Sequence, residues 1–160
     1  MRTARWIIAM LLAFCGLGSA QSAGSKGAGD IAVVVNSVNP INELSLADLR
    51  RILMGERRFW GGNVQVRLVL RERGARERDQ VLNIVLKMDN KAFAEHWRAK
   101  VFRGEASEEP LTLSSSTTAF QYLKETPGGL SFIAAKDIPA DLKILKVDGK
   151  LPGEAGYALK

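Results

Sequence analysis

Apolar residues along the chain form short continuous runs that are rich in β-branched side chains. The clearest are "DIAVVVN" at 30–36 and "VQVRLVL" at 64–70, and "LSFIA" at 130–134 and "LKILKVDG" at 142–149 are similar. A shorter run lies within "EEPLTL". Runs of this length, bounded by turn residues, are typical of buried strands. The pattern therefore predicts a central sheet of five strands.

Between these runs, apolar residues recur at helical spacing. Ser45 is a good N-cap for the first helix, with Asp48 three residues on, and Gly55 ends it. Three more helices are expected at about 75–87, at 89–102, and between the serine cluster and Pro127. Strands that alternate with helices predict an α/β domain, in which a mixed, mostly parallel sheet is flanked by helices.

The first 20 residues are expected to form a secretory signal peptide. A basic start precedes an apolar run at 6–17, and small residues lead to Ala20, after which cleavage is expected. The apolar run is too short to span a bilayer. Residues 21–29 are small and flexible and indicate a tether, and residues 30–160 are expected to form one domain.

Cysteine usage adds to this picture, because Cys15 is the only cysteine of the chain. Lipidation at Cys15 is an alternative to cleavage after Ala20, but the bulky Phe14 stands where a small residue is expected. Without the signal peptide, the chain has no disulfide, thiolate nucleophile or thiolate metal site. We expect a periplasmic protein that is held together by an ordinary apolar core.

The charge balance restricts the class of partner. The formal charge is +6, with 23 basic and 17 acidic residues, and loss of Arg2 and Arg5 with the signal peptide reduces it to about +4. Acidic residues are interleaved with the basic ones, and no basic stripe with stacking aromatic residues is visible, which argues against nucleic acid. A mild basic excess suits a small anion or an acidic surface.

The most distinctive local feature is the charged loop in "RLVLRERGARERDQ". A strand end, a glycine and a helix start form a geometry that binds anions, because free N–H groups point outward at the positive end of the helix dipole. Gly74, Ala75 and Arg76 are expected to supply amides, and Arg71 and Arg76 to supply guanidinium groups for phosphate or carboxylate oxygens. The alternative is that the acidic residues of the loop pair with its arginines.

The "SSSTT" segment supplies a second set of candidate contacts, which are Ser114, Ser115 and Ser116. Hydroxyl groups and free amides at a helix start can face an anion, whereas capping of the helix is the plainer interpretation. The two roles are compatible, because one serine can cap the helix while another faces the anion.

No residue pattern indicates catalysis or metal binding. His96 has no second histidine, cysteine or carboxylate at ligand spacing, and we expect it to be a half-exposed helix residue. Glu56 and Glu95 have no evident acid–base partner, and there is no nucleophile–base pair or glycine-rich nucleotide loop. The sequence therefore predicts a protein that is not an enzyme and that needs no cofactor or metal.

The order of these segments resembles the second lobe of periplasmic phosphate-binding proteins, the substrate-binding proteins of phosphate ABC transporters. The family has a strand ending in Asn, then Asn-Pro, a Leu-Ser-Leu-x-x-Leu helix, a glycine stop and a Trp. The matching residues here are Asn36, Asn39, Pro40, Leu44, Ser45, Leu46, Leu49, Ile52, Gly55 and Trp60. In addition, "TPGGLSFI" resembles the Pro-Gly-x-Ile-Gly-Tyr strand of the family.

The resemblance implies a single lobe of this type of periplasmic binding protein, with the loop at Arg71 in the place of the arginine and the Gly-Ser-Gly-Thr loop that cradles phosphate. Two departures matter. Here the loop is Gly74-Ala75-Arg76-Glu77, without hydroxyl groups, and the chain is long enough for only one of the two lobes that close on the ion. The fold inference survives both departures, whereas the ligand inference is weaker.

Two hypotheses for function follow. In the first, the domain binds a small oxyanion, most simply inorganic phosphate, in phosphate uptake or sensing, with a membrane permease, porin or sensor as partner. Self-association is one way to complete the cleft. In the second, the domain is a non-catalytic periplasmic interaction module that keeps the fold and has lost the ligand.

Overall fold

The structure, a computed structural model, describes residues 29–160. The expected signal peptide, its cleavage site, Cys15 and most of the expected tether lie outside the described residues. Within 29–160, no helix combines the length and the apolar character that crossing a membrane requires.

Six strands form one mixed sheet in the order β2-β6-β1-β5-β3-β4. Their bounds are β1 Ile31–Val35, β2 Glu43–Leu44, β3 Arg67–Arg71, β4 Leu111–Leu113, β5 Gly129–Ala134 and β6 Lys143–Val147. β1 is antiparallel to both of its neighbours, β5 and β6. The other three pairings are parallel, so β1 alone runs against the rest of the sheet. The predicted mostly parallel sheet is confirmed, with one strand, β2, that the apolar pattern did not predict.

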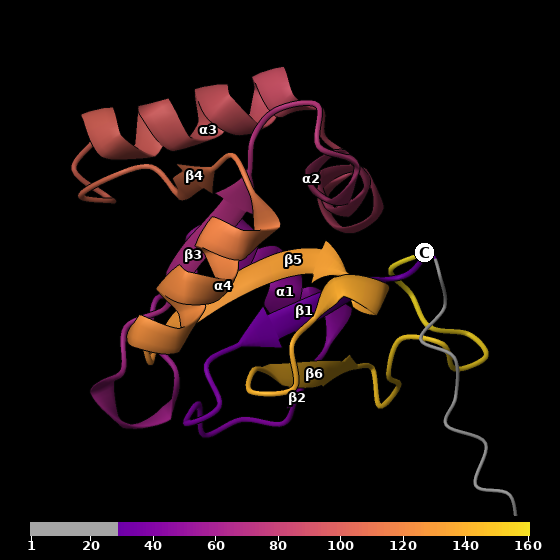
Figure 1. Cartoon of the computed structure of the whole chain (residues 1–160). Coiled ribbons are helices and arrows are strands. Elements are labelled where there is room, and N and C mark those ends of the chain that lie inside the picture. The colour runs from indigo at the N-terminus through magenta and orange to yellow at the C-terminus, as the bar shows by residue number, and fades with distance from the viewer. Residues whose placement is uncertain (1–28) are drawn as a thin grey trace, which may run out of the picture.

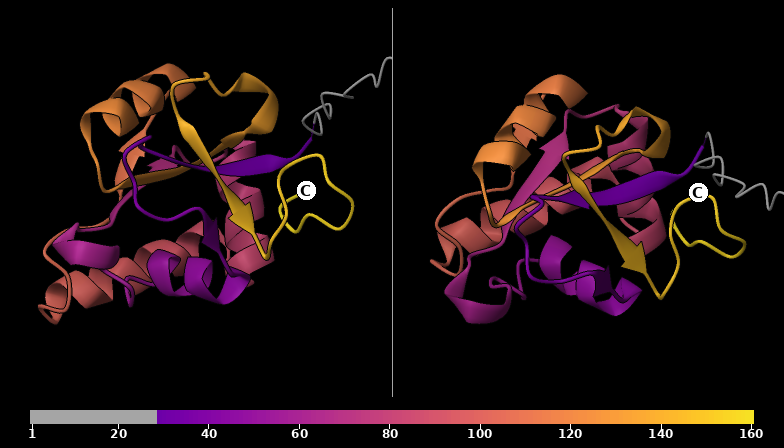
Figure 2. Two further views of the ribbon diagram at one scale, coloured as in Figure 1. Left: turned by 90° about the horizontal axis from the view of Figure 1, so that it is seen from below. Right: turned by 60° about the horizontal axis from the view of Figure 1, so that its bottom comes forward.

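Helices cover both faces of the sheet and make a three-layer α/β fold (Figure 1; Figure 2). They are α1 Leu46–Leu53, α2 Arg76–Val81, the π-helix η2 Leu82–Leu86, α3 Asn90–Phe102 and α4 Ser116–Glu125, with short 3₁₀ turns η1 Gly61–Asn63 and η3 Ala135–Asp137. α1, α2, η2 and α3 pack on one face, and α4 packs on the other. The helix expected at 75–87 is thus α2 continued by η2.

Sequence capping signals explain where most helices begin. Ser45 accepts a hydrogen bond from the Asp48 N–H at 3.0 Å, as predicted, and Asp89 caps α3 in the same way through Ala92 N–H. Lys87, with φ of 57°, adopts the left-handed conformation after η2 and turns the chain into α3.

The apolar core lies on both faces of the sheet, and β1 is buried between its two parts. Ile31, Val33 and Val35 face α1 and η2, while Ala32 and Val34 face α4. All five residues have no exposed surface. A strand that is buried on both faces has an uninterrupted apolar sequence. The apolar run at 31–35 therefore predicted β1 correctly.

Gly128 is where the start of β3 meets the start of β5. Its carbonyl accepts the Arg67 N–H at 2.8 Å and the Trp60 indole N–H at 3.0 Å. A Cβ added at Gly128 would lie 1.9 Å from the Gln65 carbonyl oxygen. Trp60 is only 3% exposed and forms part of the core.

The end of the chain closes on the start of β1. The Ile31 N–H donates to the Leu159 carbonyl at 2.8 Å, and the Tyr157 hydroxyl donates to the Ile31 carbonyl at 2.7 Å. The Asp30 carboxylate accepts the Gly153 N–H at 2.7 Å. Burial, with the negative charge of Asp30 as a second cause, raises the pKa of Tyr157 above its ordinary value.

We expect Gly128→Ala to lower the free energy of unfolding by about 2 kcal/mol or more, because the new methyl group must displace backbone at Gln65. Gly61→Ala is the matched control, since nothing lies within 4 Å of its Cβ, and should change stability by less than about 0.5 kcal/mol. Urea unfolding measures both. Equal midpoints for the two variants would contradict the close approach at Gly128.

Tyr157 should give stability a specific dependence on alkaline pH. Its pKa is raised in the fold, so its contribution is complete below the ordinary tyrosine pKa of about 10 and is lost as the pH rises above that value. Tyr157→Phe should lower the free energy of unfolding by about 1 kcal/mol at neutral pH. Above pH ~10, the free energy of unfolding should fall less steeply with pH in this variant than in the parent. Tyr122→Phe, at a half-buried position on α4, is the control that should retain the parent profile. Unfolding in urea across this pH range is the measurement, and an unchanged slope in Tyr157→Phe would contradict it.

Candidate anion site at the carboxyl ends of β3 and β4

Two parallel strands end side by side at the candidate site. β3 and β4 pair with Arg71 opposite Leu113, so the segments that follow them leave the sheet at the same edge. The Glu72 N–H donates to the Leu113 carbonyl at 3.1 Å and extends the contact by one residue. In mostly parallel α/β sheets, this carboxyl edge is where ligands bind.

Arg71 joins the end of β3 to the first turn of α4. One terminal nitrogen donates to the Ser116 hydroxyl at 2.5 Å, and the other donates to the Ser114 carbonyl at 2.9 Å. The Nε of Arg71 is buried and has no hydrogen-bond partner in the described part of the chain. The structure therefore brings together Arg71, Ser114 and Ser116, which the sequence singled out separately.

The three serines have different roles. Ser115 is the N-cap of α4, and its hydroxyl oxygen accepts the Thr118 N–H at 3.1 Å. Ser116 directs its hydroxyl to Arg71, and Ser114 contributes its carbonyl oxygen. Ser115 therefore caps the helix, whereas its neighbours Ser114 and Ser116 contact Arg71.

The turn between β3 and α2 is exposed and open. Gly74 has φ of 85°, a conformation that favours glycine, and nothing lies within 4 Å of a Cβ added there. Ala75 is the N-cap of α2 and offers no side-chain hydrogen bond, and its own N–H donates to the Glu72 carbonyl at 3.2 Å. The other three α-helices in residues 29–160 all begin with a capping Ser or Asp. The first amides of α2 are therefore left without a side-chain acceptor.

Arg76 does not direct its guanidinium to Arg71. Its Nη2 donates to the Gly29 carbonyl, where the chain enters the domain. The contribution of Arg76 at the turn is thus its backbone amide, together with a positive charge that is fixed beside the entry of the chain.

The acidic residues of the loop do not neutralise its arginines. Among residues 29–160, no ion pair joins Arg71, Arg73, Arg76 or Arg78 to a carboxylate within 4.0 Å. The carboxylate of Asp79 instead accepts a hydrogen bond from the Asn90 amide. The charge-pairing alternative drawn from the sequence is therefore wrong for this loop.

Arg78 is a residue that sequence reasoning missed. It is only 5% exposed, and it donates to Asn90 Oδ1 at 2.6 Å, to the Arg71 carbonyl at 3.0 Å and to the Thr112 hydroxyl at 3.4 Å. The sequence held a signal, since Arg78 precedes Val81, Leu82 and Val85 at the spacing of one apolar helix face. A charged residue on such a face is expected to have a specific role.

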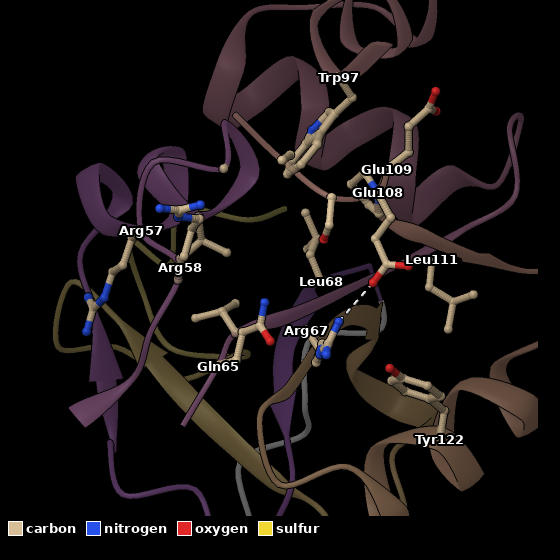
Figure 3. Close-up of a pocket in the computed structure, with 16 residues that line it drawn as sticks. Arg57, Arg58, Gln65, Arg67, Leu68, Trp97, Glu108, Glu109, Leu111 and Tyr122 are labelled. Atoms are coloured by element: carbon tan, nitrogen blue, oxygen red, sulfur yellow. Dashed lines mark hydrogen bonds and ion pairs between the residues drawn. The ribbon is translucent and has the colours of Figure 1, made fainter. Parts of the chain in front are cut away.

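A separate pocket of about 250 Å³ lies at the opposite end of β3 (Figure 3). Figure 3 shows Arg67 and Glu108 facing each other, with Arg67 Nη1 2.8 Å from Glu108 Oε1, and Leu68 and Trp97 also line the pocket. None of the predicted anion contacts lines this pocket.

The described residues contain no group of three or more His, Cys, Asp or Glu side chains placed to hold a metal ion. His96 is half-buried, and its Nε2 lies 3.0 Å from the Met54 carbonyl oxygen, which agrees with the helix position expected for it.

Comparison with solved structures identifies the fold. The domain matches an ABC-type phosphate transport receptor from Vibrio cholerae with a TM-score of 0.61 and 19% identity, over 77% of this chain and 48% of that one. It matches a putative phosphate ABC transporter substrate-binding protein with bound phosphate from Clostridium perfringens (0.63, 20%, 77% and 46%) and PstS from Borrelia burgdorferi (0.61, 16%, 77% and 49%).

These matches confirm the predicted fold, which is that of one part of a phosphate-receptor chain. The chain spans less than half the length of these receptors. No protein-family model matches the sequence, and no curated protein does.

Replacement of the α4 cap should affect stability without involving Arg71. Ser115→Ala is expected to lower the free energy of unfolding by about 1 kcal/mol, because the Thr118 N–H loses its acceptor. Ser114→Ala is the control, because only its carbonyl oxygen is used and its side chain is exposed. Thermal and urea unfolding of the two variants check this, and equal stability would exclude Ser115 as the cap.

Proposed function

We propose that this domain binds phosphate or a similar tetrahedral oxyanion at the carboxyl ends of β3 and β4, as a solute-binding component of phosphate uptake or sensing. The contacts are the guanidinium of Arg71, the backbone amides of Gly74, Ala75 and Arg76, and the start of α4 at Ser114, Ser115 and Ser116. Ligand binding in this scheme involves no chemical step.

The single observation that carries the proposal is the exposed first turn of α2. Its amides lack the side-chain cap that the other α-helices in 29–160 possess. Beside it stand four arginines for which no carboxylate of the described residues lies within ion-pair distance. Free amides and an unneutralised positive field are what an oxyanion requires. The fold match to phosphate receptors supports the choice of ion.

The affinity of one domain alone should be low. Four charge-assisted hydrogen bonds supply roughly 6–12 kcal/mol, while association costs at least about 4 kcal/mol. Micromolar binding requires about 8 kcal/mol net. Arg71 must also release the Ser114 carbonyl or the Ser116 hydroxyl to reach the ion. We therefore expect millimolar binding, which a second copy of the domain or a partner protein would strengthen by closing the cleft.

The proposed function includes export of the protein from the cytoplasm. The signal peptide expected at residues 1–20 would deliver the domain to the periplasm, where a membrane permease, porin or sensor is the partner that receives or detects the ion. The receptors with the same fold are described as phosphate transport proteins, which supports this setting.

A second candidate function has its own supporting observation. The guanidinium groups of Arg71 and Arg76 already hold acceptors of the protein itself, and the turn lacks the hydroxyl groups that the phosphate-binding family has. A domain in which these contacts are permanent would be a periplasmic interaction module without a ligand. Such a module would form a complex with an envelope protein, and the complex would not change when phosphate is added.

Calorimetric titration of the purified protein with phosphate and with sulfate tests the first proposal. We expect saturable heat with a dissociation constant on the order of 1 mM, and binding at least about tenfold weaker in Arg71→Gln, through loss of one charge-assisted contact. Arg51→Gln, an exposed arginine on α1, is the matched control and should bind as the parent does. Urea unfolding confirms that each variant is folded.

The outcome separates the two candidates. Absence of heat up to about 10 mM phosphate, or equal heat in the parent and in Arg71→Gln, contradicts the oxyanion proposal. A stable complex captured from a cell-envelope extract, equally with and without phosphate, then favours the interaction module.

A further inference from the structure

Arg78 is a buried charge without a counter-ion. Among residues 29–160 it is the one buried lysine or arginine, with 5% of its surface exposed. No carboxylate of these residues lies within 4.0 Å of it. Its protein partners, Asn90 Oδ1, the Arg71 carbonyl and the Thr112 hydroxyl, are all neutral. Transfer of an unpaired guanidinium into a protein interior is costly, and a bound anion would lower that cost.

Neighbouring charges increase this cost. Burial is the main cause that lowers the pKa of Arg78, and the positive charge of Arg73 is the second. Asp79 acts in the opposite direction, and its carboxylate also accepts a hydrogen bond from the Asn90 amide. The positive charges of Arg73 and Arg78 oppose each other, and both residues line one pocket.

A small pocket of about 80 Å³ opens onto the Arg78 side chain, on the α2 and α3 side of the sheet. The lining of this pocket includes Arg73, Arg78 and Thr112. Glu109 is the only acidic residue among the described residues that line it. Arg78 Nη2 has no acceptor in the described part of the chain, while Nε and Nη1 are occupied. Nη2 is thus the donor available to an occupant.

The rest of the lining defines the chemistry of the occupant. One wall is apolar and includes Phe93, Trp97 and Pro110. The pocket is much smaller than the one at the other end of β3, about 80 Å³ against about 250 Å³, which favours a small occupant. Glu109, which pairs with Arg98 at 3.9 Å on the rim, opposes a doubly charged ion more than a singly charged one.

We propose that this pocket binds one planar carboxylate that carries a short apolar group, with the guanidinium groups of Arg78 and Arg73 as its donors. A carboxylate matches the planar guanidinium fork, and its apolar group matches the wall of Phe93 and Trp97. The direct contacts of this site differ from those of the oxyanion site, because Arg71 extends its side chain to α4, on the other face of the sheet. Arg73 and Arg78 contribute only their positive field to the oxyanion site. The carboxylate can belong to a free short-chain acid or to the end of a peptide.

Sodium propionate at constant ionic strength is the probe, and NMR of the arginine Nε–H signals and the Trp97 indole signal is the readout. We expect a saturable shift of the Arg78 and Trp97 signals, with phosphate binding there more weakly than propionate. Arg73→Gln should weaken binding about tenfold, through loss of one charged donor, and Glu109→Gln should strengthen it. Arg103→Gln, exposed at the end of α3, is the matched control. Arg78 itself is left in place, because it ties β3, β4 and α3 together.

Several outcomes would overturn the proposal: no saturable shift, the same affinity in Arg73→Gln and Glu109→Gln as in the parent, or tighter binding of phosphate than of propionate. Arg71→Gln should leave propionate binding intact, so this result is independent of the oxyanion proposal. A short peptide with a free carboxyl end, compared with its amidated form, distinguishes the two sources. Binding of the free form alone identifies peptide ends as ligands, whereas binding of propionate without either peptide identifies small acids, and both support the carboxylate site.

Discussion

Parallel pairing of β4 with β3 brings together Arg71 and Ser116, which lie 45 residues apart in the sequence. β4 has only three residues and stands at the edge of the sheet, so its position depends almost entirely on β3. β3 in turn is held by β5, whose start is fixed at Gly128. The candidate anion site therefore depends on backbone contacts at the far end of the same strand.

Electrostatics at this edge of the sheet differ from those of the rest of the surface. Elsewhere, arginines such as Arg67 and Arg103 pair with glutamates, and the pKa of Glu105 is lowered to about 2 by hydrogen bonds from Arg103 and Lys100. Around the β3–α2 turn, the acceptors that residues 29–160 offer to Arg71, Arg76 and Arg78 are all neutral. A positive field that is concentrated at one edge attracts small anions.

The sequence was sufficient for most of the fold because local signals and burial agree. β1 is an apolar run buried on both faces, and Ser45, Asp89 and Ser115 each begin a helix as capping chemistry requires. β2 was missed because two residues carry no periodicity, and its position depends on distant β6.

The candidate site was only partly predictable. The contact of Arg71 with Ser116, the binding of Arg76 to Gly29 and the burial of Arg78 depend on which strands are neighbours, and side-chain spacing along the chain does not encode this. The missed role of Arg78 shows that a charge on an apolar helix face carries more information than a charge in a loop.

The contact of Ile31 with Leu159 means that the chain enters and leaves the domain at one place, as Figure 2 also shows. A unit with this geometry can be spliced into a surface loop of a host protein without stretching either junction. The same proximity favours circular permutation, since a short linker would join the two ends while new termini open at an exposed turn such as Gly104. The domain can therefore be moved or rearranged as one unit.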